Sequence, residues 1–522
     1  MIKKTAVTLL IVTFIATFIF HLKLNFDDIV KPPSETWGKE VLISTGDLNT
    51  SPKIMRYKEN YVVAHSDGDS FKIIIVDDLG RVLKQKKIDA DKINSKTVGI
   101  STDEKNIIVS WISSRTKKDK LVKIVKLDDS LNIISDDEVS NVMGKTEIGS
   151  NLLIINYEDN FEIRDLKLNK TMKIEEKNLK YTLGIKDKDK YVICYANMGY
   201  EYKYFYITNG EASESKVIGK MSEMRRLNFI DSEFISDGKY GYILNEYNYM
   251  GDYGGIKVTR FALGSENQGE LNEVLLENGS RASFLDVTPY YEEGKAKILV
   301  STDTYIGRKR TFSNIAEYTM IKNVAADQVP ASRTRTLSMR SNASEDTIVF
   351  CDFTSDQKSK VYITSKNEAF KNANNNARSD EYKLALIDTC TELVYSAAYI
   401  LVYGSLWIIP SLCVASLACL FEYKLKERFR KLLFVIVYIV TSGIKTFFVH
   451  GVSFTTLRYF IPDFITPIFS TSVLVIISLL CCIYGFKNYS KNVDQNVIAK
   501  SISPALLIDA YLTLLFVIPF IK

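Results

Sequence analysis

The chain has 522 residues and carries 67 Lys and Arg against 62 Asp and Glu, a formal net charge of +5. This length has room for about two to four domains. The near balance of charge excludes a nucleic-acid-binding protein that relies on bulk positive charge. Hydrophobic residues make up 46% of the chain, which excludes a disordered protein. Of the seven cysteines, only Cys194, Cys351 and Cys390 lie within residues 23–391, and this odd number argues against a disulfide scaffold there.

Charge and hydrophobicity are distributed unevenly along the chain. Residues 1–22 and 392–522 together hold 13 Lys and Arg but only 6 Asp and Glu, whereas residues 23–391 hold 54 basic and 56 acidic residues. The two ends are therefore apolar and basic, and the long middle is polar and nearly neutral. This pattern predicts membrane-spanning ends around a water-exposed central region.

The N-terminal end has the features of a signal anchor. Residues 5–20 form an apolar run that follows Lys3 and Lys4. A cleaved signal peptide ends in small residues, but His21-Leu22-Lys23-Leu24 follows this run instead. We therefore predict an uncleaved transmembrane helix over residues 1–24. A cleaved signal peptide is the alternative, and it too would export the segment that follows.

Four more apolar runs lie near the C-terminus, and each is close to the ~20 residues that a helix needs to cross a bilayer core. They are Leu393–Phe421, Leu432–Val449, Phe464–Phe486 and Ile502–Ile521. Any single run is also compatible with a buried core helix of a soluble protein. Because four such runs follow one another, we predict a four-helix transmembrane region over residues 392–522.

The basic residues between the apolar runs indicate one orientation. Lys3 and Lys4 precede the first span, five basic residues lie between the second and third, and three lie between the fourth and fifth, whereas the loop between the third and fourth holds only Arg458. Basic loops stay in the cytoplasm. We therefore predict a multi-pass cell-membrane protein with a cytoplasmic N-terminus, residues 23–391 outside and an extracytoplasmic C-terminus. The abundance of Lys, Ile and Asn indicates a bacterial source.

The central region contains a repeat of short apolar, β-rich runs separated by polar turns. One residue marks each of the seven runs: Val62, Ile107, Leu152, Val192, Tyr242, Ile298 and Ile348. The distances between successive marker residues are 45, 45, 40, 50, 56 and 50 residues. A four-stranded propeller blade has a period of about 40–50 residues. We predict a mainly β extracytoplasmic domain, a β-propeller of seven four-stranded blades. A pair of β-sandwiches is the alternative, but its strands recur every 8–12 residues and do not explain this longer period.

The two ends of the repeat region predict how the propeller closes. After the seventh run we find one more strand, Lys360–Thr364, so the last blade lacks its outer strand. An unused strand, Lys39–Ser44, precedes the first blade, and pairing it with the last blade covers an exposed sheet edge. We predict a propeller over residues 36–366 that closes in this way, followed by a linker over residues 367–391.

The central region has no recognisable catalytic motif. His65 is its only histidine, and no nucleophile elbow, zinc-protease or phosphate-binding-loop motif is present. Residues 65–70 resemble a fragment of a calcium-binding loop but lack the spaced acidic ligands and the closing Glu, and Asp-Gly is the expected residue pair of a hairpin turn. We predict no catalytic residue, no metal site and no cofactor, and the lack of these motifs favours a non-enzymatic role.

The 30 tyrosines include two clusters. Tyrosines alternate in residues 200–206, so they share one face of a strand and are expected to pack between blades. In the second cluster, Tyr247, Tyr249 and Tyr253 precede Gly254 and are expected on an exposed loop. Tyrosine rings offer a large rigid surface with a polar tip, so we predict that these three residues contact a ligand.

Ionisable residues within predicted spans are functional candidates. Lys445 lies in the third span and Asp509 in the fifth, at depths that differ by several ångströms in the predicted topology. We expect Lys445 to extend toward the outer water and Asp509 to cap a neighbouring helix, and an ion or proton path is the alternative. Ser411, Ala415 and Cys419 recur every four residues, a small-residue stripe that lets helices pack closely.

These features favour a membrane protein that displays a propeller outside the cell. We expect the propeller to bind a protein or glycan partner and the helices to anchor it in the lipid bilayer or to contact a membrane-protein partner. We expect no nucleic-acid partner. Two alternatives remain: a transporter or transporter subunit that uses Lys445 and Asp509, and a propeller hydrolase or lyase with carboxylates in its central channel.

Overall fold

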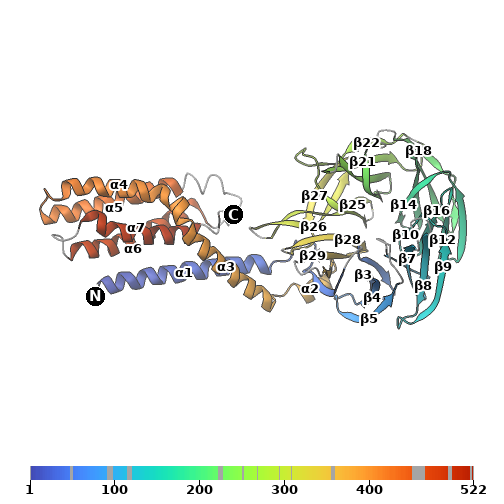
Figure 1. The fold of residues 1–522 in the computed structure, drawn as a ribbon, viewed down its shortest axis with the longest axis horizontal. Helices are drawn as coiled ribbons and strands as arrows, with labels where there is room; N and C mark the ends of the chain where they lie inside the picture. The colour runs from blue at the N-terminus through green and yellow to red at the C-terminus, as the bar shows by residue number, and fades with distance from the viewer. Residues whose placement is uncertain are drawn as a thin grey trace. The chain divides into compact units, whose positions relative to one another are not determined.

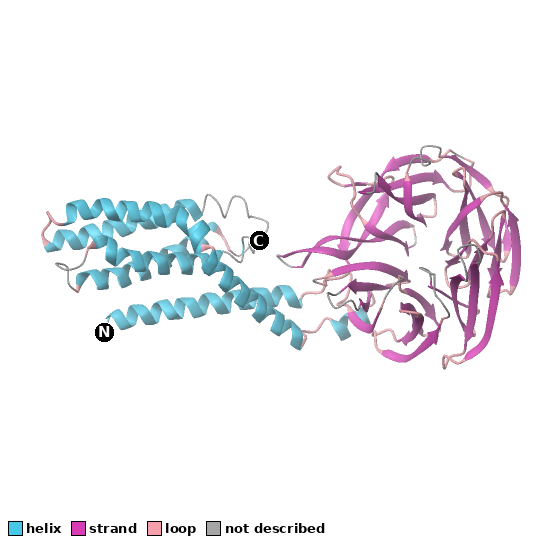
Figure 2. Cartoon of the chain, in the orientation of Figure 1, coloured by secondary structure: helices cyan, strands magenta, loops and turns pink. Residues whose placement is uncertain are grey.

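The computed structural model describes most of the chain. The described residues are 2–47, 51–90, 98–114, 120–221, 227–249, 252–266, 268–292, 294–306, 309–334, 336–353, 359–449, 465–491, 497–517 and 520. They fold into two units (Figures 1 and 2). A helical unit contains Met1–Lys31 and Ala377–Lys522, and a β unit contains Pro32–Tyr305 and Arg310–Asn376.

The β unit is a seven-bladed β-propeller, as the repeat predicts. Its strands form seven separate sheets of four or five strands. Blades 1 to 3 consist of β2 Lys53–Tyr57, β3 Asn60–Asp67, β4 Ser70–Val76 and β5 Val82–Asp89; β6 Val98–Thr102, β7 Ile107–Ser114, β8 Lys120–Leu127 and β9 Ile133–Ser140; and β10 Gly144–Ile148, β11 Leu152–Asn156, β12 Asn160–Asp165 and β13 Lys170–Glu175.

The later blades contain longer strands and two additional ones. Blades 4 and 5 consist of β14 Leu179–Asp187, β15 Lys190–Asn197, β16 Glu201–Thr208, β17 Glu211–Ala212 and β18 Lys216–Lys220; and β19 Asn228–Ser236, β20 Tyr240–Tyr249, β21 Asp252–Ala262 and β22 Glu270–Glu273. Blade 6 consists of β24 Leu285–Glu292, β25 Lys295–Ile306, β26 Lys309–Ile321 and β27 Val324–Pro330, with β23 Leu275–Leu276 added parallel to β27.

The first strand of each blade contacts the first strand of the next. The contacts run from β2 through β6, β10, β14, β19, β24 and β28 and return to β2, which makes a closed ring of inner strands. The apolar runs that define the sequence repeat are the second strands of the seven blades. Second strands such as β3 and β11 are buried almost throughout, because neighbouring blades cover both of their faces.

The predicted closure is confirmed. The last blade consists of β28 Leu337–Ser344, β29 Thr347–Phe353, β30 Ser359–Ser365 and β1 Val41–Gly46, and β1 is the outer strand, antiparallel to β30. Ile43 of β1 and Ile363 of β30 are buried in the same apolar cluster as Val63 and Ile74 of blade 1. The N-terminal strand therefore joins the last blade to the first.

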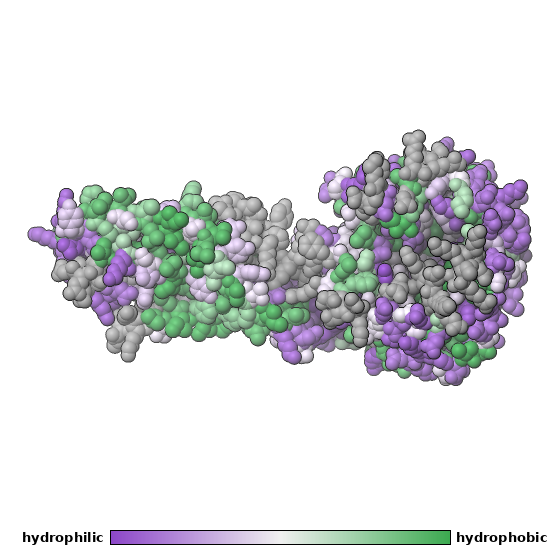
Figure 3. Space-filling view, viewed as in Figure 1, coloured by the Kyte–Doolittle hydropathy of each residue, from purple (hydrophilic) through white to green (hydrophobic). Residues whose placement is uncertain are grey.

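The helical unit contains five helices or helical stretches that are long and apolar enough to span a membrane, within the part of the chain that the structure describes. Its elements are α1 Ile2–Val30, α3 Ser379–Ala398, the π-helix η2 Ile400–Gly404, α4 Ser405–Glu422, α5 Glu427–Val449, α6 Pro467–Ser490 and α7 Ile498–Val517. Thr466 caps the N-terminus of α6, and Pro467 occupies its first turn, where the missing N–H costs nothing. Apolar side chains cover much of this unit's visible surface (Figure 3).

The predicted linker over residues 367–391 contains helices. A short helix, α2 Glu368–Asn374, begins at the cap residue Asn367 and belongs to the β unit. The first part of α3 follows, and α3, η2 and α4 together form a helical stretch of 44 residues, Ser379–Glu422. No helix was predicted here, because residues 372–376 are rich in Asn, which favours loops. Phe370 of α2 is buried in the same cluster as Ile363 of β30, and this packing favours the helix. Arg458, used above to predict orientation, lies outside the described residues.

Candidate functional site

The central channel of the propeller is the first candidate site. A cavity of about 430 Å³ lies on this channel, within the range of small-molecule sites. Its walls come from the inner strands of six blades, including the ends of β10, β14, β24 and β28 and the turns that follow them. The β28–β29 turn, which contributes Glu345, lies beside the end of β30, since the Lys366 N–H donates to the Asp346 carbonyl over 2.9 Å. The cavity therefore lies at the end of the propeller where the chain leaves it.

Four basic and two acidic side chains line this cavity, which gives its walls a surplus of positive charge. The basic residues are Lys53, Arg56, Lys186 and Lys188, and the acidic residues are Glu147 and Glu345. Arg56 is held by Asp78 and lies 3.9 Å from Glu345. The ammonium of Lys186 lies 6.0 Å from the centre of the Tyr191 ring, and Lys186 is exposed.

The negative charge of Glu147 is compensated by a buried lysine inside the propeller. Its carboxylate pairs with Lys145, whose side chain is completely buried, and accepts a 2.6 Å hydrogen bond from the Ser110 hydroxyl. Burial alone raises the pKa of a carboxyl group, but the Lys145 ammonium and these hydrogen bonds outweigh it and lower the pKa of Glu147 below its usual value. Glu147 therefore lines the cavity as an ionised carboxylate whose charge is balanced by Lys145.

A group of carboxylates converges on the channel from blades 5 and 6. Asp231 and Glu233 lie on β19, Glu246 lies on β20 opposite Asp231, and Asp286 lies on β24. Glu246 Oε1 accepts a 2.7 Å hydrogen bond from the Val287 N–H, which links blade 5 to blade 6. Burial raises the pKa of Glu233 to about 8 and that of Glu246 to about 7, and it also raises the pKa values of Asp231 and Asp286. Glu233 and Glu246 thus titrate near neutral pH.

Nothing in the sequence spacing distinguishes these carboxylates from ordinary surface residues. Asp231, Glu233 and Glu246 belong to a region with many acidic residues, and only the pairing of β19 with β20 brings them together. The one available signal is that Glu233 and Glu246 lie inside β-rich runs rather than in turns. Among the residues that the structure describes, no three His, Cys, Asp or Glu side chains are placed to hold a metal ion.

His65 is not available as a catalytic base. It is fully buried, its Nδ1 donates to the Ser66 carbonyl over 2.8 Å, and its Nε2 lies 2.9 Å from the Ser44 hydroxyl. Burial lowers the pKa of His65 to about 4. Asp67 pairs with Ser70 across the turn between β3 and β4, so the segment that resembles a calcium-binding loop is the predicted hairpin turn.

The tyrosine prediction needs correction. Tyr247 and Tyr249 belong to β20 and Tyr253 to β21, so none of the three lies on the expected loop. Tyr247 is buried, and its hydroxyl donates to Glu273 over 2.9 Å. Both glycines lie within β21 rather than in a turn. Gly255 pairs with Tyr247, and Gly254 lies at an irregularity of the ladder, where a Cβ would collide with the Tyr247 ring. A ligand contact by these tyrosines remains a prediction, and the side chains of Tyr249 and Tyr253 lie outside the described part of the structure.

The tyrosines of residues 200–206 show the expected packing. Tyr202 and Tyr204 are fully buried in the cluster shared by blades 4, 5 and 6. The hydroxyl of Tyr202 lies 2.8 Å from that of Tyr181. Tyr204 donates to the Ser265 carbonyl over 3.0 Å. This cluster therefore stabilises the contact between blades.

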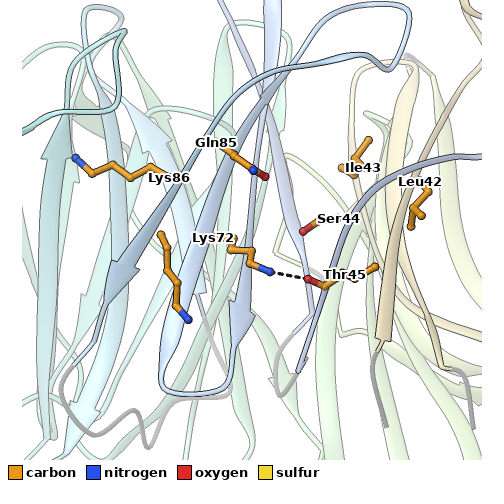
Figure 4. Close-up of a pocket in the computed structure, with 8 residues that line it drawn as sticks. Leu42, Ile43, Ser44, Thr45, Lys72, Gln85 and Lys86 are labelled. Carbon is orange, nitrogen blue, oxygen red and sulfur yellow. Dashed lines mark hydrogen bonds between the residues drawn. The ribbon is translucent and has the colours of Figure 1, made fainter. Parts of the chain in front are cut away.

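A second cavity, of about 560 Å³, lies between the closing strand β1 and blade 1 (Figure 4). Lys72 donates from its ammonium to the Thr45 carbonyl over 2.6 Å and pairs with Asp67 at 3.1 Å. Lys86 points away from β1 in the figure, and its ammonium donates to the Leu131 carbonyl on blade 2. Because these lysines already have partners, this cavity is a weaker candidate than the channel.

The helical unit contains a buried ion pair that the sequence pattern did not predict. Lys445 and Asp509 were expected to lie apart, but Lys445 Nζ is 2.8 Å from Asp509 Oδ1, and both side chains are almost fully buried. The ammonium also donates to the hydroxyls of Ser478 and Thr513 and to the Leu474 carbonyl. The long, flexible lysine side chain bridges the offset in depth along the helices. The pair therefore connects α5, α6 and α7.

The predicted small-residue stripe lies on the inner face of α4. Ser411 and Ala415 are fully buried, and Cys419 Sγ accepts a 3.4 Å hydrogen bond from the Ala499 N–H of α7. One turn further on, buried Glu422 accepts hydrogen bonds from the Tyr489 hydroxyl and from the Ile498 N–H at the start of α7. These contacts join α4, α6 and α7 at one end of the bundle.

Comparisons with known proteins find structures but no relatives by sequence. No family model matches the chain, and no curated protein matches it. Three similar structures are the N-terminal domain of Nup159 (10% identity, 64% of this chain and 96% of that one, TM-score 0.40), hydrazine synthase from Kuenenia stuttgartiensis (10%, 60% and 96%, 0.38) and the Cps50 (Swd1) β-propeller domain from Myceliophteria thermophila (10%, 62% and 98%, 0.38).

Proposed function

We propose that this protein is a multi-pass membrane protein that displays its propeller on the outer side of the membrane, where the propeller binds a protein or glycan partner. One observation carries the proposal. The segments that precede and follow the propeller in the chain lie side by side at its edge, and each is connected to a helix or helical stretch long enough to span a membrane. An anchored propeller presents its channel and loops to a partner, and propellers serve widely as interaction platforms.

The two connections are held together where they leave the propeller. The Gly38 N–H donates to the Ser365 carbonyl over 3.0 Å, and the Thr364 hydroxyl donates to the Gly38 carbonyl over 2.7 Å. Lys39 is fully buried, and its ammonium donates to the Asn376 carbonyl over 3.0 Å. The segments at which the chain enters and leaves the propeller therefore lie side by side and are joined by hydrogen bonds.

The same two connections also pair within the helical unit. Asn25 of α1 donates to Thr389 Oγ1 over 3.0 Å and to Glu392 Oε2 over 2.9 Å, both on α3. The rings of Phe26 and Tyr382 stack with their centres 4.2 Å apart. The 29 residues of α1 extend about 44 Å, more than the ~30 Å of a hydrocarbon core. These contacts support α1 as a retained helix rather than a cleaved signal peptide.

The distribution of lysine and arginine supports the proposed orientation. Lys424, Lys426, Arg428 and Arg430 lie at the junction of α4 and α5, and Lys3 and Lys4 lie at the start of α1. Positively charged loops remain in the cytoplasm. In this orientation the propeller is extracytoplasmic.

Labelling of intact cells with a membrane-impermeant amine reagent tests the orientation. Lys177, exposed on the propeller, is expected to react in intact cells, whereas Lys424 and Lys426, exposed at the α4–α5 junction, are expected to react only after permeabilisation. Both sets are exposed lysines of the same chain, so each controls for the reactivity of the other. Labelling of Lys424 but not of Lys177 in intact cells would overturn the proposal.

Cross-linking on intact cells tests the binding role. The full-length protein carries a tag, and an impermeant amine cross-linker captures neighbours of the propeller. We expect one protein or glycan component to be enriched over a control with another tagged multi-pass protein. Absence of any enriched component from both membrane and wall fractions would contradict a binding role.

A further inference from the structure

We propose that the channel cavity binds a small ligand with two or more acid groups, phosphate or carboxylate, through Lys186, Lys188 and Arg56. The inference rests on the proposed function, because it takes the propeller to be a binding module and names the site and the ligand class. It begins from the composition of the cavity wall, in which basic side chains outnumber acidic ones by four to two.

The acidic groups of the wall are already compensated. Glu147 is paired with the buried Lys145 and accepts from Ser110. Glu345 lies 3.9 Å from the guanidinium of Arg56. Both carboxylates of the wall thus have positively charged partners of their own.

Lys186 is the basic group with the least compensation. In the part of the chain that the structure describes, no carboxylate lies within ion-pair distance of its ammonium, and its neighbour is the Tyr191 ring at 6.0 Å. Lys188 follows in the β14–β15 turn, where its backbone has a positive φ of 55°. The two lysines are two residues apart, one in β14 and one in the turn that follows it, and both line the same cavity.

Lys53 has a different environment from Lys186. It also lines the cavity, but its positive charge partly offsets the burial that raises the pKa values of Asp231 and Glu233. Its charge is thus shared with those carboxyl groups. Arg56 is shared in the same way, because it pairs with Asp78 and lies 3.9 Å from Glu345. We expect the acid groups of the ligand to lie mainly toward Lys186 and Lys188, with smaller contributions from Arg56 and Lys53.

The shape and polarity of the cavity fit this ligand class. A volume of about 430 Å³ accommodates a small organic ligand but not a folded partner. The basic groups come from blades 1 and 4, on two sides of the channel, which favours a ligand with more than one acid group. Charge-assisted hydrogen bonds from lysine and arginine to such groups are stronger than neutral ones.

The test is calorimetric titration of the full-length protein in phosphatidylcholine nanodiscs with pyrophosphate and with citrate. We expect saturable binding of at least one of them that weakens as salt is raised. Lys186→Gln and Lys188→Gln are expected to weaken it by about tenfold or more, and Lys53→Gln by less. Lys177→Gln removes the same charge from the exposed turn between β13 and β14 and is expected to leave binding unchanged.

A second arm distinguishes a soluble ligand from a lipid headgroup. The titration with pyrophosphate is repeated in nanodiscs that contain phosphatidylglycerol. If pyrophosphate binds in phosphatidylcholine but not in phosphatidylglycerol, the lipid headgroup competes for the cavity. If pyrophosphate binds equally in both, the ligand is a soluble one. Either result supports an acid-binding cavity. Absence of saturable binding of both anions in phosphatidylcholine, or binding that Lys186→Gln and Lys188→Gln leave unchanged, would overturn it.

This test separates the inference from the proposed function. If cross-linking on intact cells still captures the partner while no anion binds the cavity, the propeller is a binding module whose site lies elsewhere. Both lysines are exposed, so their replacement is not expected to unfold the propeller. Thermal unfolding of each variant checks this directly.

Discussion

Each unit of the protein contains a buried lysine–carboxylate pair, and the two pairs are built differently. In the propeller, the Lys145 side chain is 0% exposed and that of Glu147 is 16% exposed, because Glu147 borders the channel cavity. In the helical unit, Lys445 and Asp509 are only 1% and 3% exposed. The propeller pair has space for water beside it, whereas the helical pair is enclosed by protein.

The enclosed pair has more protein partners as a result. Lys445 donates to Asp509, to the hydroxyls of Ser478 and Thr513 and to the Leu474 carbonyl. Lys145, by contrast, has Glu147 as its partner. A polar group without access to water must find its hydrogen bonds within the protein, since an unsatisfied group costs several kcal/mol there. The comparison indicates that the helical pair fixes the packing of three helices, while the propeller pair shapes a solvated channel.

The largest expected effect follows from breaking the helical pair. Asp509→Asn leaves the Lys445 ammonium buried without a counter-charge, and we expect a loss of about 3–5 kcal/mol of stability. Hydrogen exchange of peptides from α5, α6 and α7, measured by mass spectrometry in micelles, reports this loss. The double variant Lys445→Met, Asp509→Leu removes both charges and is expected to recover most of the protection. Full protection in Asp509→Asn alone would contradict this role.

A smaller effect is expected from breaking the propeller pair. Lys145→Met leaves Glu147 with the Ser110 hydroxyl and with channel water, so we expect a loss of about 1–3 kcal/mol. Denaturant unfolding of the full-length protein, with exchange of β10 peptides as the local readout, measures it. Lys173→Met is the matched control, because Lys173 pairs with Glu175 on the exposed strand β13 and its loss is expected to cost less than about 0.5 kcal/mol. An equal effect of the two variants would contradict the comparison.

The channel carboxylates predict a pH dependence of the propeller. Folding raises the pKa values of Glu233 and Glu246 to about 8 and about 7, so the folded state binds their protons more tightly than the unfolded chain does. The stability of the propeller should therefore fall as pH rises from about 5 toward 8. Melting temperatures across this range measure the trend. Glu233→Gln should flatten it, and a stability that rises over this range in both proteins would contradict it.

The smallest effect is expected at the contact between α1 and α3. Asn25→Leu removes the two hydrogen bonds to Thr389 and Glu392, and we expect faster exchange of α1 peptides and a loss of about 1–2 kcal/mol. Thr13→Val is the control, because the Thr13 hydroxyl donates to the Leu9 carbonyl of its own helix. Exchange of α1 as slow in Asn25→Leu as in the original protein would show that apolar packing alone holds this contact.

Much of the architecture follows from local patterns in the sequence. The second strands of the blades contain consecutive apolar residues, such as Val62–Ala64 and Leu152–Ile155, because both of their faces are covered, and this makes their spacing visible. The closing strand around Ile43 is recognisable because the last blade would otherwise lack a strand. The helix α2 was missed because Asn-rich sequences favour turns, whereas the cap at Asn367 and the burial of Phe370 stabilise a helix here.

The sequence by itself determined the repeat, the apolar helices and the closure of the propeller, because each depends on hydrophobic periodicity and length along one stretch of chain. Only the tertiary structure decided which polar groups meet. The channel carboxylates come from three strands of two blades, and Lys445 and Asp509 are 64 residues apart in the chain. These contacts depend on how each strand or helix is rotated and shifted relative to its neighbours, and a local sequence pattern does not contain this information.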